Sequence, residues 1–204
     1  MTLFYLIRHG ENDWTGKKIT GWAPGIHLNA RGQGQAEAMP GLLAGVRLKA
    51  VYSSPLERTL ETAEPLARRQ GLRVVPRPAL GEVRYGRWEG QSLPSLRRRK
   101  LWAIIQQSPS LARFPDGESF IEVQSRVVAE METLRAEHAR DTIACVSHAD
   151  TIKLAIAHYL GLPLDHFQRL SIAPASISLL SVIDGQARLL LLNDTRATEQ
   201  AATG

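Results

Sequence analysis

The sequence lacks a second cysteine for an internal disulfide and lacks a segment that would contact a lipid bilayer. It has one cysteine, Cys145, so an internal disulfide is excluded. Cys145 lies inside the apolar run 142–146 with no cation beside it to activate the thiol, and we expect a small core residue rather than a nucleophile. No apolar run is long enough to cross a bilayer, and the N-terminus shows no signal peptide. These absences predict a cytoplasmic protein that does not contact membranes.

Internal repeats, low-complexity tracts and long linkers are also missing. The 204 residues are 44% hydrophobic and 22% charged, which predicts one globular domain over 1–204 with a flexible tail at 198–204. The net charge of +5 favours acidic partners such as phosphorylated metabolites or nucleic acid. The basic cluster 97–100 has no stacking aromatics between its charges, which argues against nucleic acid. We expect this cluster to be a solvated helix face, with contact to an anionic substrate as the alternative.

Strand and helix patterns alternate along the chain. The expected strands are 3–8, 51–53, 72–75 and 142–146, followed by a hairpin of 176–183 and 187–192 about Asp184-Gly185. The expected helices are one that starts at Asn29 and is kinked or divided at Pro40-Gly41, then 56–70, 93–107, 119–138 and 151–160. This order predicts an α/β three-layer sandwich, with a mostly parallel central sheet, helices on both faces and an antiparallel edge. That edge is a candidate surface for a homodimer.

Polar residues of types that are common in catalytic sites follow the predicted strands. Arg8-His9-Gly10 ends the first strand, and His148 repeats this placement after the strand at 142–146. Arg58 lies one turn into the helix that follows Ser53, and the glycine-rich segment 80–90 carries Glu82 and Glu89. Because ligands bind at the carboxyl ends of strands in open α/β sheets, we expect these groups to converge.

Together these groups match the needs of phosphate-ester chemistry. Arginines neutralise the oxygens of a phosphoryl group, a neutral histidine nitrogen attacks phosphorus, and a carboxylic acid protonates the departing oxygen. We expect a backbone carbonyl near Gly10 to hold one ring N–H of His9 and thereby fix its tautomer. No metal ion or cofactor is needed for these steps.

Four motifs recur here with the spacing of a known family. They are Arg-His-Gly at 8–10, Ser-Ser-Pro-x-x-Arg-x-x-x-Thr at 53–62, Leu-x-Glu-x-x-x-Gly-x-Trp-Glu-Gly at 80–90, and Val-Ser-His at 146–148. With this spacing the chain resembles the histidine phosphatase superfamily, which includes the cofactor-dependent phosphoglycerate mutases. The resemblance implies that His9 is the phosphorylated nucleophile and Glu82 the proton donor, with Arg8, Arg58 and His148 completing a phosphate pocket.

The same resemblance implies further substrate contacts and leaves some roles open. Candidate substrate-binding residues are Thr15, Thr20, Gly21, Tyr85 and Ala149. Glu118 either reaches the pocket or acts as a charge at the start of the helix at 119–138. Glu89 is the alternative to Glu82 as the acid.

Three departures from the mutase pattern favour a phosphatase. Thr15 stands where the mutases usually carry Asn, and Ala149-Asp150 replaces their Gly-Asn or Gly-Gly. The chain is also too short for the mutases' insertion after the Glu82 region. A carboxylate at Asp150 is unfavourable beside phosphate, so we expect it to face away or to meet an arginine. A mutase and a non-catalytic phosphate-binding regulatory protein remain the alternatives to a phosphomonoesterase, and the substrate is left open.

Overall fold

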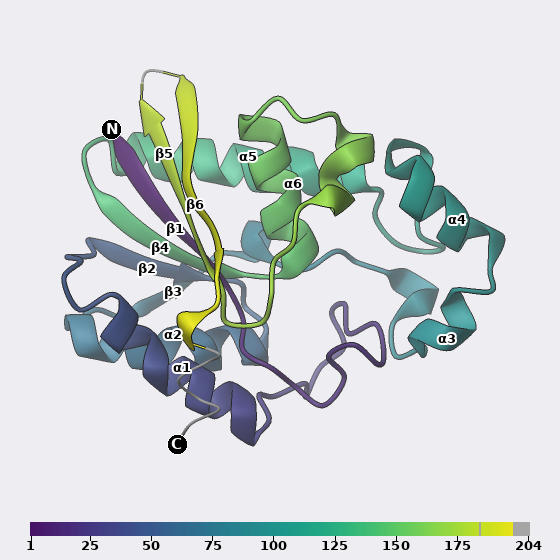
Figure 1. Ribbon diagram of the computed structural model, residues 1–204, viewed down its shortest axis with the longest axis horizontal. Helices are drawn as coiled ribbons and strands as arrows, with labels where there is room; N and C mark the ends of the chain where they lie inside the picture. The colour runs from purple at the N-terminus through teal and green to yellow at the C-terminus, as the bar shows by residue number, and fades with distance from the viewer. Residues whose placement is uncertain (184, 198–204) are drawn as a thin grey trace.

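The computed structural model describes residues 1–183 and 185–197, and a six-stranded sheet forms its centre (Figure 1). The strands follow the order β3-β2-β4-β1-β5-β6 across the sheet. Their bounds are β1 (Thr2–Arg8), β2 (Ala50–Ser53), β3 (Val74–Pro76), β4 (Thr142–Ser147), β5 (Ile177–Ile183) and β6 (Gln186–Asp194). Strands β3, β2, β4 and β1 are parallel, whereas β5 and β6 are antiparallel at one edge. The predicted sheet is therefore confirmed.

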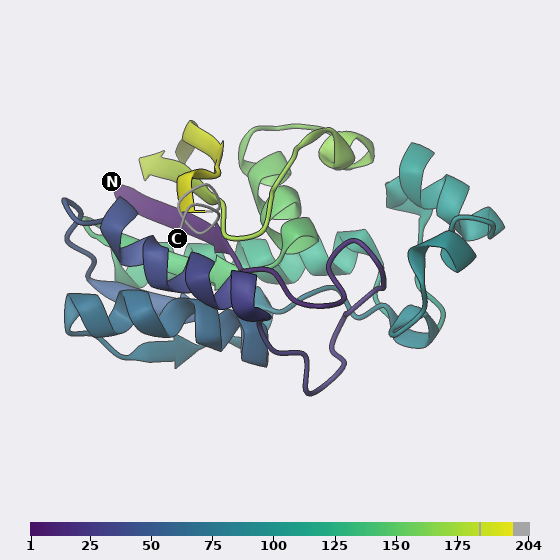
Figure 2. The same cartoon turned by 60° about the horizontal axis from the view of Figure 1, so that its bottom comes forward.

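Helices cover both faces of the sheet (Figures 1 and 2). One face carries α1 (Ala30–Leu42) and α2 (Glu57–Gln70), and the other carries α5 (Phe120–Glu137) and α6 (Ala149–Tyr159). Side chains alternate along β1, so Phe4 and Leu6 pack with α5 and α6 while Ile7 packs with α1 and α2. This arrangement is the predicted three-layer sandwich. Short 3-10 turns join the elements: η1 (Pro78–Leu80), η2 (Gly86–Trp88), η3 (Pro109–Leu111) and η4 (Leu164–Arg169).

The strand register brings the polar ends of the strands together. Arg8 in β1 lies opposite Ser147 in β4, so His9 and His148 leave the sheet side by side. The N–H of His9 donates to the carbonyl of Ser147 at 3.0 Å. On the other side of β4, Ser53 at the end of β2 lies opposite Val146. Helix α2, which follows β2, therefore starts at the same edge of the sheet.

The prediction of one continuous helix at 93–107 is wrong. The structure has two helices, α3 (Leu93–Leu96) and α4 (Lys100–Gln107), separated by an extended Arg99. Leu96 and Ile105 are both buried in one cluster with Phe114. At about 100° per residue, side chains nine positions apart lie on opposite sides of a continuous helix. The interruption allows both to reach the same core, and it leaves the basic cluster 97–100 exposed.

Smaller differences concern element boundaries. Helix α1 is not divided at Pro40 but ends at Leu42, which lies only two residues beyond the proline. Strand β3 begins at Val74 and α6 at Ala149, each two residues from the predicted start. The hairpin of β5 and β6 is present, but Asp184 of its predicted turn and the predicted tail 198–204 lie outside the described residues.

Strand β6 forms an edge of the sheet with exposed leucines at 190–192. The use of this edge in a homodimer stays a prediction. None of the helices in residues 1–183 and 185–197 has the length and apolarity that a membrane span requires.

Gly32 sets how closely α1 approaches the loop that follows β1. A Cβ added to Gly32 would lie 2.0 Å from the carbonyl oxygen of Glu11, whereas one added to Gly41, in the same helix, would meet nothing within 4 Å. We expect Gly32→Ala to lower the free energy of unfolding by about 3 kcal/mol, since backbone atoms must move. Gly41→Ala is the matched control and should raise it by up to about 1 kcal/mol. Urea denaturation measures both, and equal effects would contradict the packing argument.

Candidate active site

His9 lies at the end of β1 and is 3% exposed. Its Nδ1 is 2.7 Å from the carbonyl oxygen of Gly10. A carbonyl only accepts hydrogen bonds, so Nδ1 carries the proton and Nε2 carries the lone pair, as expected from the sequence. Burial, and after it the charges of Arg58 and Arg8, lower the pKa of His9 well below its usual value. The ring is therefore neutral at neutral pH.

His148 lies next to His9, with 5.2 Å between the ring centroids. Its Nε2 is 2.8 Å from the hydroxyl of Ser54, and its Nδ1 is 3.2 Å from Nη2 of Arg58. Because a guanidinium only donates, Nδ1 of His148 accepts and the Nε2–H donates to Ser54. Burial first, and then the charge of Arg58, lower the pKa of His148 well below its usual value. This second ring is thus also neutral.

Arg58 is fully buried in the first turn of α2. Its Nη2 donates to the carbonyl of Gly21 at 2.8 Å, and Nη1 of Arg8 donates to the carbonyl of Ile172 at 2.7 Å. Among the described residues, Nε and Nη1 of Arg58 and Nε of Arg8 are buried without a hydrogen-bond partner. Buried donors without an acceptor are costly, and an oxyanion beside His9 would supply the acceptor.

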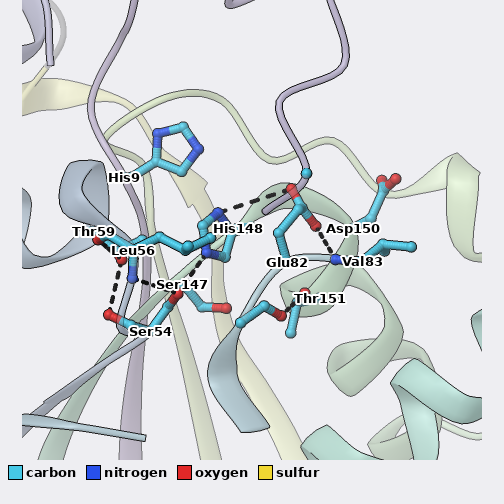
Figure 3. Close-up of polar contacts among 12 residues, drawn as sticks. His9, Ser54, Leu56, Thr59, Glu82, Val83, Ser147, His148, Asp150 and Thr151 are labelled. Carbon is cyan, nitrogen blue, oxygen red and sulfur yellow. Dashed lines mark hydrogen bonds and ion pairs between the residues drawn. The ribbon is translucent and has the colours of Figure 1, made fainter. Parts of the chain in front are cut away.

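Glu82 lies between η1 and η2 and is 7% exposed. Figure 3 shows its carboxyl group between His148 and Val83. One carboxyl oxygen accepts the backbone N–H of Val83 at 2.9 Å, and the other is 3.9 Å from Nδ1 of His148. Burial, reinforced by the charge of Asp150, raises the pKa of Glu82 to about 7. A large share of Glu82 is therefore protonated at neutral pH, which a proton donor requires.

A cavity of about 170 Å³ opens beside these groups. Its lining residues are Arg8, His9, Asn12, Thr15, Gly16, Lys18, Ile19, Thr20, Glu82, Tyr85, Leu93, Ala149 and Asp150. Of the candidate residues, Arg58, His148 and Gly21 do not line it, although Gly21 contributes the carbonyl that holds Arg58. Glu89 is also outside the lining and accepts the N–H of Tyr85 at 3.2 Å. The geometry therefore favours Glu82 over Glu89 as the acid.

The lining residues that were not named as candidates from the sequence include two with polar side chains, Asn12 and Lys18. Asn12 is 2% exposed and accepts the backbone N–H of Trp14, and its position three residues after His9 was a usable signal. Lys18 brings a positive charge to the wall from the loop that also carries Thr15 and Thr20.

Asp150 is one of the residues that line the cavity, and its charge acts on Arg8, as the expectation of a nearby arginine requires. Its carboxylate also accepts from the hydroxyl of Tyr85 at 2.9 Å and pairs with Lys153 at 3.4 Å, a partner that was not expected. Lys153 lies three residues further along α6, where side chains share one face of the helix.

Of the two roles expected for Glu118, contact with the pocket is wrong. Glu118 does not line the cavity, and the capping box of α5 consists of Ser119 and Glu122. Glu118 pairs instead with Arg126 and accepts the N–H of Arg84. Both expected roles depended on local sequence, whereas its partners come from the tertiary packing.

Cys145 is fully buried, and burial raises the pKa of its thiol. It packs in the core between the sheet and α5 and α6, which agrees with the structural role expected from the sequence. Within the part of the chain that the structure describes, no group of three or more His, Cys, Asp or Glu side chains is placed to hold a metal ion.

Comparison with known proteins shows the family of the chain. The family model of the histidine phosphatase superfamily (branch 1) matches residues 4–195. The chain belongs to the histidine phosphatase superfamily. As a member of it, the protein is a hydrolase of the histidine phosphatase type, and the resemblance recognised from the sequence is confirmed.

The chain is similar both to proteins named as phosphoserine phosphatases and to proteins named as phosphoglycerate mutases. Phosphoserine phosphatase 1 of Hydrogenobacter thermophilus is 29% identical over 203 residues, covering 96% of this chain and 93% of the relative. The probable phosphoglycerate mutase GpmB of Proteus mirabilis is 32% identical over 184 residues, covering 87% and 84%. Among solved structures, phosphoserine phosphatase from Entamoeba histolytica in complex with 3-phosphoglyceric acid has a TM-score of 0.88 at 27% identity, covering 97% of this chain and 100% of that chain.

Proposed function

We propose that this chain is one catalytic domain that hydrolyses a small phosphate monoester through a phosphohistidine at His9. The observation that carries the proposal is a neutral His9 that lines a cavity beside the buried, unpaired donors of Arg8 and Arg58. Glu82, with its raised pKa, is the acid within the same cavity.

In the first proposed step, Nε2 of His9 forms a bond to phosphorus as the bond from phosphorus to the ester oxygen breaks. Arg8 and Arg58 donate to the non-bridging oxygens, and His148 maintains the orientation of Arg58. The departing oxygen takes the proton of Glu82 and leaves as an alcohol. The two guanidiniums neutralise the negative charge on the phosphoryl oxygens, and the proposed step uses no metal ion.

In the second proposed step, a water oxygen attacks phosphorus as the bond from Nε2 of His9 to phosphorus breaks. Glu82, now a carboxylate, accepts the proton of that water and returns to its acid form. Inorganic phosphate leaves, and His9 is again neutral with its lone pair on Nε2.

The cavity wall supports a small polar substrate. Thr15 and Thr20 bring hydroxyls, and α6 presents its positive N-terminal end at Ala149. Lys18 and Asp150 add one charge of each sign, which suits a substrate with both a carboxylate and an amine beside its phosphate. The phosphoserine phosphatase among the similar proteins supports this substrate class.

A phosphoglycerate mutase is the second candidate, since a relative of 32% identity carries that name. We expect inorganic phosphate as the main product from phosphoserine and from 3-phosphoglycerate, with or without 2,3-bisphosphoglycerate. Product analysis by NMR measures this directly. An isomerised phosphoglycerate as the main product would establish the mutase instead, and no phosphohistidine after exposure to an aryl phosphate would indicate a non-catalytic phosphate-binding protein.

The raised pKa of Glu82 predicts the pH dependence. Glu82 holds its proton below a pH of about 7 and loses it above, so kcat/KM for an alkyl phosphate should fall on the alkaline side. The lowered pKa of His9 keeps the ring neutral on the acid side, so its protonation should not limit the rate near pH 6.5. The profile of Glu82→Gln on the same substrate is the control, because the substrate's own ionisation cancels. An alkaline limb that persists in Glu82→Gln would contradict the assignment.

A further inference from the structure

The segment that carries Glu82 is held by side chains from elsewhere in the fold. Carbonyl groups of four consecutive residues, 79–82, accept hydrogen bonds from such side chains. The donors are Arg126 to Ala79, Gly81 and Glu82, Ser147 to Leu80, Thr151 to Gly81, and Trp22 to Glu82, at distances from 2.6 to 2.9 Å. None of these donors lines the cavity.

Arg126 makes more of these bonds than any other donor. From α5, its Nη1 donates to Ala79 at 2.8 Å and to Gly81 at 2.9 Å, and its Nη2 donates to the carbonyl of Glu82 at 2.8 Å. One guanidinium therefore contacts three of the four residues that lead to the carboxyl group of Glu82. A lysine cannot replace it, because an ammonium lacks the planar fork that reaches several acceptors at once.

Glu118 extends the same contact to the other side of Glu82. It pairs with Arg126 through both oxygens, at 2.8 Å to Nε and 3.1 Å to Nη2. One of these oxygens also accepts the backbone N–H of Arg84 at 2.8 Å. The side chains of Arg126 and Glu118 are 22% and 18% exposed, so the pair is shielded from most of the solvent. We name Arg126 and Glu118 together the Arg126–Glu118 bracket.

We infer that the Arg126–Glu118 bracket positions Glu82 for proton transfer. The inference rests on the proposed function, in which Glu82 protonates the leaving oxygen. Proton transfer requires the carboxyl group at hydrogen-bond distance from that oxygen, and a misplacement of about 1 Å costs on the order of 10²-fold in rate. The bracket restrains the backbone before and after Glu82 without touching the substrate, so Arg126 is a positioning residue.

Two substrates separate positioning of the acid from general damage. An alkyl phosphate such as phosphoserine needs a proton on its leaving oxygen, whereas 4-nitrophenyl phosphate releases a stable phenolate. We expect Arg126→Gln to lower kcat/KM by about 30-fold to 100-fold for the alkyl phosphate and by less than about threefold for the aryl phosphate. The ratio kcat/KM covers only the steps up to release of the alcohol, so the later use of Glu82 as a base does not enter. Equal losses on both substrates would overturn the inference.

Arg126→Lys separates geometry from charge. Arg126 also lowers the pKa of His148 through its charge, although burial is the largest cause of that shift. A lysine keeps the charge and loses the fork, so we expect Arg126→Lys to follow Arg126→Gln on the alkyl phosphate. Wild-type kcat/KM in Arg126→Lys would show that charge alone suffices and would overturn the bracket. Circular dichroism of each variant confirms that the fold persists.

Glu82→Gln and Arg135→Gln complete the experiment. Arg135 lies on α5 and pairs with Glu132, so Arg135→Gln is the matched control and should equal wild type on both substrates. Glu82→Gln should lose activity on the alkyl phosphate selectively. If it does not, the proposed role of Glu82 fails, and the inference fails with it. If Glu82→Gln discriminates between the substrates and Arg126→Gln does not, only the inference fails.

Discussion

His9→Ala is expected to lower kcat/KM on any phosphate monoester by about 10⁴-fold or more, since loss of a nucleophile removes the covalent route itself. The reason is specific to one nitrogen. The Gly10 carbonyl holds the proton on Nδ1, and burial beside Arg8 and Arg58 keeps the ring neutral. Nε2 therefore carries the lone pair of a ring that lines the cavity. Alanine leaves Glu82 and both guanidiniums in place but gives phosphorus nothing to bond to.

The measurement has two parts, steady-state kinetics and trapping of the phosphoenzyme. Denaturing quench of wild type with a labelled aryl phosphate should leave acid-labile phosphate on the chain, and His9→Ala should leave none. His158→Gln is the matched control, because His158 is exposed on α6 and should behave as wild type. A purified, folded His9→Ala protein with full activity would remove His9 as the nucleophile.

Arg58→Met should lower kcat/KM by about 10³-fold, the order lost with a preorganised donor or an arginine that stabilises phosphoryl transfer. Arg58 is fully buried, and its Nε and Nη1 have no partner among the described residues. Burial lowers the pKa of its guanidinium, which reflects the cost of holding a charge there without an anion. Methionine removes that cost, so the melting temperature should not fall despite the loss of activity.

Thermal melts with and without vanadate test the binding half of this prediction. Vanadate should raise the melting temperature of wild type and leave that of Arg58→Met unchanged, since a ligand stabilises only the state that binds it. Arg68→Met is the control, because Arg68 lies exposed on the same helix and pairs with Glu37. An unchanged vanadate shift in Arg58→Met would show that Arg58 does not contact the anion.

The edge of the sheet that carries the candidate site could be predicted from local pattern. The apolar run before Arg8 and the run before His148 each read as a buried strand, and parallel strands end at one edge. The pairing of Arg8 with Ser147 bears this out. The glycine that follows His9 allows α1 to approach closely, since a Cβ at Gly10 would lie 2.7 Å from the carbonyl oxygen of Gly32.

Contacts between distant segments could not be predicted in this way. The apolar spacing at 93–107 fits a single helix, yet Leu96 and Ile105 must reach one core, and the chain breaks to allow it. The sequence did not indicate the role of Arg126. Its partners are backbone carbonyl groups, which every residue has, so no sequence motif marks them. Local periodicity records which face of an element is buried but not which element covers it.

By itself, the sequence determined which chemical groups stand at the strand ends: two imidazoles, two guanidiniums and a carboxyl group in a glycine-rich segment. Only the tertiary structure decided their protonation states and their positions. Burial and neighbouring charges lower the pKa of both histidines and raise that of Glu82. Those charges come from β1, α2, α5 and α6, elements far apart in the chain, because a pKa depends on distance and desolvation rather than on sequence order.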